Sequence, residues 1–520
     1  SYEGSRPLRF WTTHVDPVAG SLNAMVDGSP SGTSRADAVT QTVTFTSGQA
    51  AVSAAYFDAG AIRLEVDADA GTPGVLEGAS NGFVVRPAEL VVSAVESLSG
   101  TANPAATTMA GPAFLTAGTP FRVQVIAVAT NGAITPGFGL EAAPENVRVS
   151  SAALLAPAGG RNGSTGDVAG GATFSRTGPG TFSSSSVSFD EVGIIALNPA
   201  IADGDYLGTG SVPGRLSDGI GRFYPERFVL TDSTVTAACG DFTYLGQPQL
   251  SLSYRIEARN SLGAIVENYD ASLISVASLA AVTRVAEDSD NGVDLSARLS
   301  TSVPLWARGV LNESTTTVNL ARSSGADGPF DQLQLGVQLI DTLDGGTLAG
   351  LDMHPATSGD CSAGAGCVAQ RIGAPTRARY GRLAVLPGVA PESEALSVPL
   401  QAQYFDGVGF RAHREDRCSL YSVASTALGA FTAELNPGET SVTGPAAPTA
   451  LVDGEATTAA PLQLAAPGLG NAGTVEVTLD VPSWLEFDWR GAGVADPSGL
   501  QTFGTYRGSD RVVYWEEVDP

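Results

Sequence analysis

One pentapeptide has the spacing of a serine nucleophile. Residues 78–82 read Gly-Ala-Ser-Asn-Gly, which matches the G-x-S-x-G elbow with Ser80 at its centre. In that elbow the serine sits on a strained turn between a strand and a helix. The residues that follow, 83–87 (Phe-Val-Val-Arg-Pro), favour a strand, and none of the three histidines is an obvious general base. We therefore expect an ordinary turn here.

A second glycine motif has the spacing of a dinucleotide-binding loop. Residues 468–473 read Gly-Leu-Gly-Asn-Ala-Gly. Such a loop must open a helix whose N-terminus faces the pyrophosphate, whereas the alternating run that follows at 474–481 predicts a strand. The motif is expected to be a loop. The sequence predicts no catalytic residue and indicates a protein that is not an enzyme.

An acidic turn offers oxygen ligands for a hard cation. Residues 288–294 read Asp-Ser-Asp-Asn-Gly-Val-Asp, a density of oxygen atoms typical of calcium loops. The glycine falls one position early for an EF-hand, and no glutamate stands at the twelfth position. Calcium at this turn is the one cofactor hypothesis that the sequence raises, and an ordinary solvated acidic turn is the alternative.

A run near the C-terminus combines tryptophan with carboxylates. If residues 481–489 form a strand, Trp484, Glu486 and Asp488 share one face, with hydrophobic side chains on the other. An indole beside carboxylates is a surface that a sugar or a protein can contact, and two carboxylates on one strand face lie near enough for acid/base work. We take these three as candidate surface-recognition residues, and core packing of the tryptophan is the alternative.

The four cysteines are candidates for disulfide bonds. They are Cys239, Cys361, Cys367 and Cys418, an even number in a chain rich in small polar residues, as in oxidising compartments. The flexible segment between Cys361 and Cys367 can close on itself, which would leave Cys239 and Cys418 as a second pair. Free buried thiols and a metal site are the alternatives, although no metal-ligand spacing is present.

Alternation of apolar and polar residues with a period of two recurs along the whole chain. This pattern predicts half-buried antiparallel strands, and Asn-Gly and Asp-Gly pairs between the runs predict tight turns. The sequence therefore predicts an all-β protein of tandem immunoglobulin-like β-sandwich domains. Long Gly/Ser/Pro-rich loops are expected at 158–186 and 436–470. The clearest strand runs are 42–46, 121–125, 250–258, 333–339 and 475–481.

Two internal echoes indicate repeated domains. Residues 57–64, followed by 83–87, resemble residues 189–197 followed by 222–225, and residues 127–135 resemble residues 258–266. Boundaries near Pro87 and Pro225 follow, since a proline ends strand pairing and stiffens a linker. A softer boundary falls near 375–380. The length of 520 residues suggests three to four domains, which we assign as 1–87, 88–225, 226–377 and 378–520.

The charge balance excludes one class of partner. The chain carries 54 Asp and Glu against 28 cationic residues, all of them arginine, for a net charge of −26. Binding to DNA or RNA depends on local cations, so nucleic acid is excluded as a partner. No apolar run approaches the length of a membrane-spanning helix. The chain opens without a signal sequence, so a secreted protein would be represented here in mature or trimmed form.

A family resemblance is carried by residues 221–228, 239–248, 327–330, 380–383, 416–418, 484–489, 503–508 and 511–515. These segments resemble the MshQ-like proteins, which are encoded with the mannose-sensitive haemagglutinin (MSHA) type IV pilus of Gram-negative bacteria. The resemblance extends over nearly all of the chain. It implies a large, secreted, β-rich protein of the pilus system, displayed at the cell surface or the pilus tip, with no catalytic residue to transfer. Arginines inside these segments are expected in ion pairs: Arg222, Arg227, Arg382, Arg417, Arg507 and Arg511.

Three functions are compatible with the sequence. The first is a non-enzymatic extracellular protein of an MSHA-like pilus, acting in adhesion or as a tip or assembly component, with pilus components and host or environmental glycans as partners. The second is a surface or filament subunit that assembles with copies of itself through strand edges, because few charges protect those edges. The third is a carbohydrate-binding or carbohydrate-active protein.

Overall fold

The computed structural model describes residues 3–20, 22–68, 77–163, 173–300, 302–359, 361, 366–489 and 491–504. Within these ranges the chain is almost entirely strand and loop, so the all-β prediction is confirmed. The helices of the described ranges are four single turns of 3-10 geometry: η1 (Arg35–Asp37), η2 (Val276–Ser278), η3 (Ser296–Arg298) and η4 (Val423–Ser425). No helix among the described residues is long and apolar enough to cross a membrane.

The first unit pairs a five-stranded sheet, in the order β4-β1-β6-β7 with β8 on β6, with a small sheet of order β3-β2-β5. Phe10, Val26 and Val43 are buried together between them. The strands are β1 (Gly4–Asp16), β2 (Met25–Val26), β3 (Ser29–Pro30), β4 (Val39–Phe45), β5 (Ala54–Ala55), β6 (Gly60–Ala68), β7 (Glu77–Ala79) and β8 (Phe83–Val85).

The second unit is a sandwich of two sheets, in the orders β10-β17-β15-β12 and β13-β14-β11-β9-β16. Its core is rich in phenylalanine, and the Phe223 ring lies 5.4 Å from Phe189 and 5.5 Å from Phe121 between centroids. The strands are β9 (Glu89–Ser97), β10 (Leu115–Thr116), β11 (Phe121–Val128), β12 (Val147–Ala156), β13 (Ser175–Gly178), β14 (Thr181–Val187), β15 (Gly193–Ile201), β16 (Gly214–Arg215) and β17 (Ile220–Tyr224).

The third unit is a second sandwich, with sheets of order β18-β20-β22 and β19-β24-β23-β21. The regular alternation of residues 250–258 becomes β20, whose inward side chains Leu250, Leu252 and Tyr254 are each at most 1% exposed. The strands are β18 (Arg227–Thr236), β19 (Phe242–Tyr244), β20 (Leu250–Arg259), β21 (Ala281–Asp288), β22 (Val310–Val318), β23 (Phe330–Ile340) and β24 (Gln370–Arg379).

The fourth unit is built from smaller sheets, of orders β25-β28-β29, β26-β36-β35-β31, β27-β34-β32 and β30-β33. Its core also contains Phe242 and Tyr244, which belong to β19 of the third unit. The strands are β25 (Gly381–Val385), β26 (Gly388–Ala390), β27 (Leu396–Ser397), β28 (Leu400–Phe405), β29 (Phe410–Ala412), β30 (Leu420–Tyr421), β31 (Thr426–Gly429), β32 (Val442–Thr443), β33 (Thr449–Ala450), β34 (Gln463–Leu464), β35 (Gly473–Leu479) and β36 (Ser498–Phe503).

One loop prediction is wrong in part. The Gly/Ser-rich stretch 158–186 contains strand β13 and most of β14, and β14 pairs with the core strand β11. Buried Phe182 anchors the strand in the core, and β14 lies between β13 and β11 in the sheet. Residues 436–470 remain mostly loop, with the two-residue strands β32, β33 and β34.

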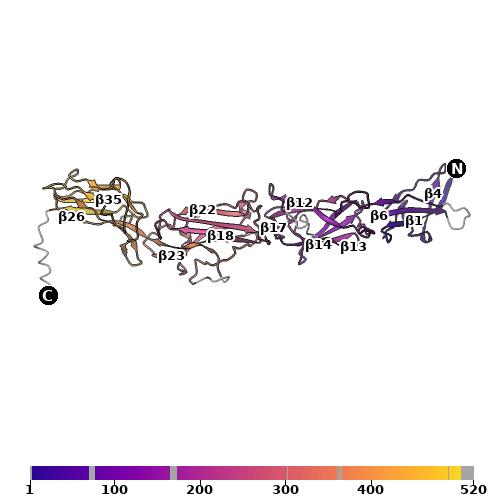
Figure 1. Cartoon of the computed structure of the whole chain (residues 1–520), viewed down its shortest axis with the longest axis horizontal. Helices are drawn as coiled ribbons and strands as arrows, with labels where there is room; N and C mark the ends of the chain where they lie inside the picture. The colour runs from indigo at the N-terminus through magenta and orange to yellow at the C-terminus, as the bar shows by residue number, and fades with distance from the viewer. Residues whose placement is uncertain are drawn as a thin grey trace.

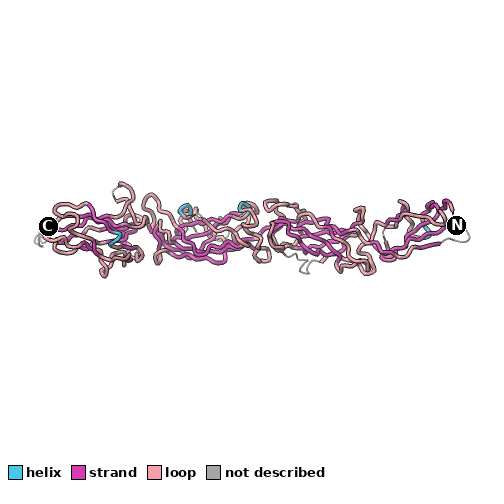
Figure 2. The backbone as a smooth tube through the Cα atoms, turned by 90° about the horizontal axis from the view of Figure 1, so that it is seen from above, coloured by secondary structure: helices cyan, strands magenta, loops and turns pink. Residues whose placement is uncertain are grey.

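The four units follow one another in a row, so the molecule is a rod. β1 and β4 lie at one end and β26 and β35 at the other, and both views show the same elongated outline (Figure 1, Figure 2). The connections are short: residues 86–88 separate β8 from β9, residues 225–226 separate β17 from β18, and Tyr380 alone separates β24 from β25. Linkers of this length leave little room for independent movement of the units.

Candidate functional site at the domain junctions

A buried carboxylate joins the first unit to the second. Asp58 is 1% exposed, and its Oδ1 accepts the backbone N–H of Ala59 at 2.8 Å and of Gly137, in the second unit, at 2.6 Å. Burial raises the pKa of Asp58, and these N–H donors oppose the rise. Asp16 adds a second contact, because its Oδ1 accepts the N–H of Ala142 at 2.7 Å.

The same contact recurs between the second and third units. Glu191 is 2% exposed, and its carboxylate accepts the N–H groups of Val192, Glu267 and Asn268 at 2.8, 2.8 and 3.1 Å. Val192 follows Glu191 as Ala59 follows Asp58, whereas Glu267 and Asn268 belong to the third unit. Burial raises the pKa of Glu191, with the three N–H groups acting against it.

The repeat extends to the glycines behind these carboxylates. Gly60 and Gly193 each stand two residues after the acidic residue, with φ of 144° and 150°. A Cβ on either would lie 2.6 Å from a backbone carbonyl oxygen, of Asp16 and of Ala156 respectively, so the close approach requires glycine at both places. The first sequence echo therefore contains the acceptor carboxylate of a repeated junction, and the second ends one or two residues before the N–H donors Gly137, Glu267 and Asn268.

A buried ion pair adds to the second junction. Arg222 of β17 and Asp344 of the third unit have side chains only 3% and 5% exposed. The contact is bidentate, with Nη1 to Oδ2 at 2.7 Å and Nη2 to Oδ1 at 2.5 Å, and Nε donates to the Gly111 carbonyl. Such a fork-on-carboxylate contact fixes orientation as well as distance.

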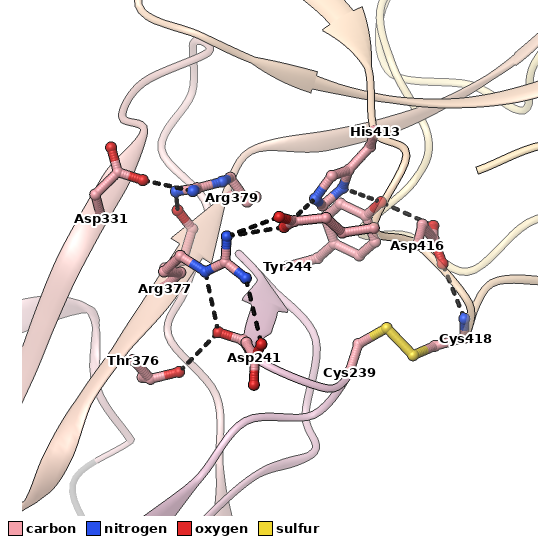
Figure 3. A network of polar contacts seen from close by, with 12 residues as sticks. Cys239, Asp241, Tyr244, Asp331, Thr376, Arg377, Arg379, His413, Asp416 and Cys418 are labelled. Carbon is pink, nitrogen blue, oxygen red and sulfur yellow. Dashed lines mark hydrogen bonds and ion pairs between the residues drawn. A yellow bond between two sulfur atoms is a disulfide. The ribbon is translucent and has the colours of Figure 1, made fainter. Parts of the chain in front are cut away.

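The third junction is covalent. A disulfide joins Cys239 of the third unit to Cys418 of the fourth, with Cα atoms 5.8 Å apart (Figure 3). Arg377 of β24 reaches the same loop, because its Nη1 lies 2.9 Å from a carboxylate oxygen of Glu415. The second disulfide, Cys361 to Cys367, closes a short loop inside the third unit.

A buried polar network crosses this junction beside the disulfide (Figure 3). Tyr244 donates its hydroxyl proton to Asp416 Oδ2 at 2.8 Å, and His413 Nδ1 lies 2.8 Å from the same hydroxyl oxygen. Since the hydroxyl group gives its one proton to Asp416, His413 Nδ1 is the donor in the second contact. Asp416 also accepts the N–H groups of Cys418 and Ser419. Burial lowers the pKa of His413 to about 4.

Potential metal ligands cluster here without fitting a metal. Among the described residues, Cys239, Asp416 and Cys418 form the one close group of three such ligands. The two sulfur atoms are joined to each other, and the Asp416 carboxylate is already occupied by protein donors. This chemistry fits a structural link and not a metal centre.

The neutral His413 predicts an acid-sensitive junction. Its folded pKa of about 4 lies below the unfolded value near 6.5, so between these pH values the unfolded state binds more protons. The free energy of unfolding therefore falls as the pH is lowered from 6.5 to 4, by about 2 to 3 kcal/mol. His413→Gln keeps a donor without titrating, and denaturation curves at both pH values should show a smaller loss than in the wild type. A matched His354→Gln variant should keep the wild-type loss, and equal losses in all three proteins would contradict the assignment.

Trp484, Glu486 and Asp488 do not share the expected strand face, because residues 481–489 do not form a strand. Their role in surface recognition stays a prediction. Residues 483–485 form a turn, closed by the Leu485 N–H on the Pro482 carbonyl at 2.8 Å. Trp484 is half-buried against the fourth core, and the exposed Asp488 accepts the Ala492 N–H at 3.0 Å. Glu486 offers its backbone carbonyl to Arg322, a residue of the third unit. The strand does not form here because Pro482 has no backbone N–H to donate to a neighbouring strand.

Neither glycine motif leads into a helix, and residues 468–472 are the expected loop before β35. Residues 78–82 are not the expected turn, because β7 and β8 both pair with β6 and the segment between them continues along that strand. Ser80 lies between β7 and β8, where its hydroxyl accepts the Leu64 N–H and donates to the Asn81 carbonyl. No helix follows it, so the serine is not presented as an elbow nucleophile. Residues 468–473 lead into β35, and no helix N-terminus faces them.

The acidic turn 288–294 uses its carboxylates within the protein. Asp288 accepts the Gln332 N–H, Asp294 accepts the Ser296 N–H, and Asp290 pairs with Arg371 at 2.7 Å. Calcium binding at this turn stays a prediction. The unusual group is the neighbouring Glu287, which is 1% exposed. Burial, and then Asp290, raise its pKa to about 7.

Glu287 predicts a pH effect of the opposite sign. Its folded pKa of about 7 lies above the usual glutamate value, so the folded state binds the extra proton between about pH 4.5 and 7. Stability from this group is present below pH 4.5 and is lost as the pH rises through 7. Glu287→Gln should therefore raise the free energy of unfolding at pH 8 by about 1 kcal/mol or more, with no gain at pH 4.5. Thermal melts at both pH values test this, with Asp294→Asn as the control. A gain that does not depend on pH would contradict it.

The arginine prediction holds in part. Arg222 pairs with Asp344, and Arg417 pairs with Asp453 at 2.8 Å. For Arg382 the prediction of an ion pair is wrong. Its guanidinium carbon lies 3.7, 4.7 and 4.4 Å from the ring centroids of Phe410, Phe487 and Trp489. Burial lowers the pKa of Arg382 to about 10. Arg227 forms no ion pair among the described residues, and Arg507 and Arg511 lie outside them.

Sequence reasoning missed the residues that fix the junctions. Asp58 and Glu191 lie inside the recognised echo 57–64 and 189–197, but the echo does not show which loop faces the carboxylate. Tyr244 and Asp416 lie inside family-like segments, and His413 stands just before one. One sequence signal could have indicated the network at the third junction, because His413 is an isolated histidine close to Cys418 in sequence.

Comparison with protein families accounts for almost the whole chain. The four domains of one family, described as a domain of unknown function (DUF6701), match in order. The first, described as an Ig-like domain, matches residues 1–86, the second 86–185, the third 191–368 and the fourth 379–518. A comparison with curated proteins found no match.

Solved structures give only distant likenesses. The chain is similar to the adhesin InvE of Yersinia pseudotuberculosis, with 14% identity and a TM-score of 0.18, over 53% of this chain and 60% of the adhesin. Drosophila N-cadherin EC1-4 has 8% identity and a TM-score of 0.15, covering 96% and 92% of the two chains. A SusE-like surface polysaccharide-binding protein of Bacteroides thetaiotaomicron has 10% identity and a TM-score of 0.11, covering 97% and 96%. Likenesses at these scores carry no inference about function.

Proposed function

The chain belongs to the DUF6701 family, and from that premise we propose that it is a non-enzymatic extracellular rod of an MSHA-like type IV pilus system. In this proposal the rod acts in adhesion, or as a component of the pilus tip or its assembly, at the surface of a Gram-negative bacterium. The observation that carries it is the row of β units with short linkers and buried contacts at each junction. A rod of this kind holds one end of a protein far from its anchor.

The segments that carry the pilus-protein resemblance support this proposal by their position. Residues 221–228 contain Arg222 and form the second junction, whereas residues 239–248 and 416–418 contain the disulfide and network residues of the third. Residues 380–383 contain Tyr380, which connects β24 to β25, and the first three residues of β25. Several of the segments that carry the resemblance therefore lie at the second and third junctions, which fix how successive units are oriented. The two disulfides also suit an oxidising, extracellular compartment.

Immunogold labelling of purified pili tests the proposal. Antibody against the chain should label pili or the cell surface, and labelling should disappear in a strain that lacks the gene. Deletion should also lower adherence of the bacteria, with complementation restoring it. Label confined to the cytoplasm, or unchanged adherence together with unlabelled pili, would overturn the proposal.

Self-association is a second candidate, favoured by one observation. β4 is an edge strand that pairs only with β1 among the described strands, and its seven residues, 39–45, include no charge and no proline. Unprotected edges of this kind are templates for another strand. Electron microscopy of purified protein separates the two candidates, because ordered polymers without pilins favour self-assembly. Thr42→Arg, which places a charge on the edge, should then abolish the polymers.

A further inference from the structure

A cavity of about 370 Å3 lies where the third and fourth units meet. The third unit contributes Gln247 and Gln249 to its wall, and the fourth contributes Ser419, Leu420 and Trp484. The volume falls within the range of small-molecule sites. Because the two walls come from different units, the cavity exists only while the junction keeps its geometry.

The chemistry of the wall is neutral in a strongly acidic protein. No Asp, Glu, Arg or His lines the cavity, although the chain has a net charge of −26. The lining combines an indole and aliphatic surface with amide and hydroxyl groups. A charged ligand would find no counter-charge in this wall, whereas an uncharged ligand with one apolar face and several hydroxyl groups matches it.

Two polar groups in the wall have unused hydrogen-bonding capacity. Gln247 is 7% exposed, and its Oε1 accepts the Tyr244 N–H at 3.0 Å, which fixes the amide. Its Nε2 has no acceptor among the described residues and remains a donor. Ser419 gives its hydroxyl proton to Asp416 Oδ2 at 2.6 Å, so the hydroxyl oxygen is left as an acceptor. A donor and an acceptor are therefore held in place by the network of the junction.

The apolar part of the wall is exposed for contact. Leu420, which lines the cavity together with Trp484, is 53% exposed. Trp484 is half-buried, with part of its side chain packed on the fourth core. That packing fixes the ring, so it can act as a platform without the entropy cost of ordering a free side chain.

We propose that this cavity binds one pyranose residue of a neutral glycan. The C–H face of the sugar packs on Trp484 and Leu420, while Gln247 Nε2 donates to one hydroxyl group and Ser419 Oγ accepts from another. Gln249 lies at the exposed part of the wall and binds a third hydroxyl group. The proposal names the ligand class for the adhesive role proposed above and rests on that role for the source of the glycan; the binding chemistry rests on the cavity alone.

The disulfide makes this binding sensitive to redox state. Cys418 and Ala238, the neighbour of Cys239, both line the cavity. A dithiol such as dithiothreitol, which is itself oxidised to a cyclic disulfide, reduces the Cys239–Cys418 bond to two thiols and so removes the covalent link between the two walls. We expect affinity for the glycan to be lost on reduction under conditions in which the units stay folded.

Binding of neutral and sialylated oligosaccharides to the full chain tests the proposal. An array of both kinds gives the preference, and calorimetry with the best methyl pyranoside gives the affinity. Neutral hexosides should bind, and Trp484→Ala should weaken binding about tenfold or more. Gln249→Leu, at an exposed position that the fold does not need, should weaken it severalfold. Trp489→Ala is the matched control, because this indole stacks on Arg382 outside the cavity, and it should bind as the wild type does.

Three outcomes would overturn the proposal: no neutral hexoside binds, sialylated glycans bind in preference, or Gln249→Leu and Trp489→Ala bind equally well. Immunogold labelling of pili, carried out beside the glycan-binding measurements, separates a failure of the sugar site from a failure of the proposed function. Pili from cells that produce the Trp484→Ala protein should be labelled as in the wild type. Labelled pili without glycan binding by the wild type would remove the sugar site alone. Unlabelled pili with normal glycan binding would remove the pilus role alone.

Discussion

Replacing Cys239 and Cys418 together by serine is expected to lower the free energy of unfolding at the third junction by about 5 kcal/mol. The bond closes a loop with a sequence separation of 179, and restricting a chain of that length in the unfolded state contributes about that much by loop-closure entropy. The variant should also separate the third and fourth units into two transitions in guanidinium denaturation, whereas the wild type unfolds them together. The disulfide holds the segment that contains Phe242 and Tyr244 in the core of the fourth unit, so its removal is expected to uncouple the two units.

The second disulfide supplies the control for this experiment. Cys361 and Cys367 are separated by only 6 in sequence, so replacing both by serine removes a much shorter loop and costs about 2 kcal/mol. That loss should fall on the third unit without separating its transition from that of the fourth. Equal effects of the two double variants, or a single unchanged transition without Cys239–Cys418, would contradict a covalent junction as the link.

The second large effect is expected at Arg222. Arg222→Leu leaves Asp344 as a buried carboxylate, 5% exposed, without its cation, and breaking a buried pair in this way costs about 3 to 5 kcal/mol. The double variant Arg222→Leu/Asp344→Leu removes both charges and should recover most of the loss. Chemical denaturation of the four proteins in this cycle gives the coupling energy directly.

An exposed ion pair in the same chain is the matched control. Arg417 and Asp453 have side chains 70% and 61% exposed, so Arg417→Leu should change the free energy of unfolding by about 0.5 kcal/mol or less. If Arg222→Leu cost no more than Arg417→Leu, or if the double variant were as unstable as the single one, the second junction would not depend on this ion pair.

The sequence predicted the strands well where one face of a strand is buried. The alternation in residues 250–258 and 333–339 predicted β20 and β23, because a period of two leaves no other regular structure for a half-buried segment. It failed at 481–489, where Pro482 and the anchored Trp484 make a turn despite alternating residues. It also failed at 175–186, where buried Phe182 makes a strand out of a serine-rich run.

The sequence indicated which loops lie at the junctions but not which residues make contact there. The echoes placed the loops that contain Asp58 and Glu191, yet a carboxylate that accepts N–H groups 76 to 79 residues further along the chain leaves no local pattern. The same limit applies to the network of Tyr244, His413 and Asp416. Its partners are 169 and 172 residues apart and meet only after two units have folded. Long-range polar contacts of this kind are determined by packing, not by spacing.

The junctions are expected to hold the four units in a fixed row. Negative-stain electron microscopy of the purified chain measures the angles between successive units in single molecules. We expect one straight class with a narrow distribution of angles at all three junctions, and bending at the third junction after the Cys239→Ser/Cys418→Ser change. Broad angle distributions in the wild type, equal to those of the variant, would contradict the rigid rod.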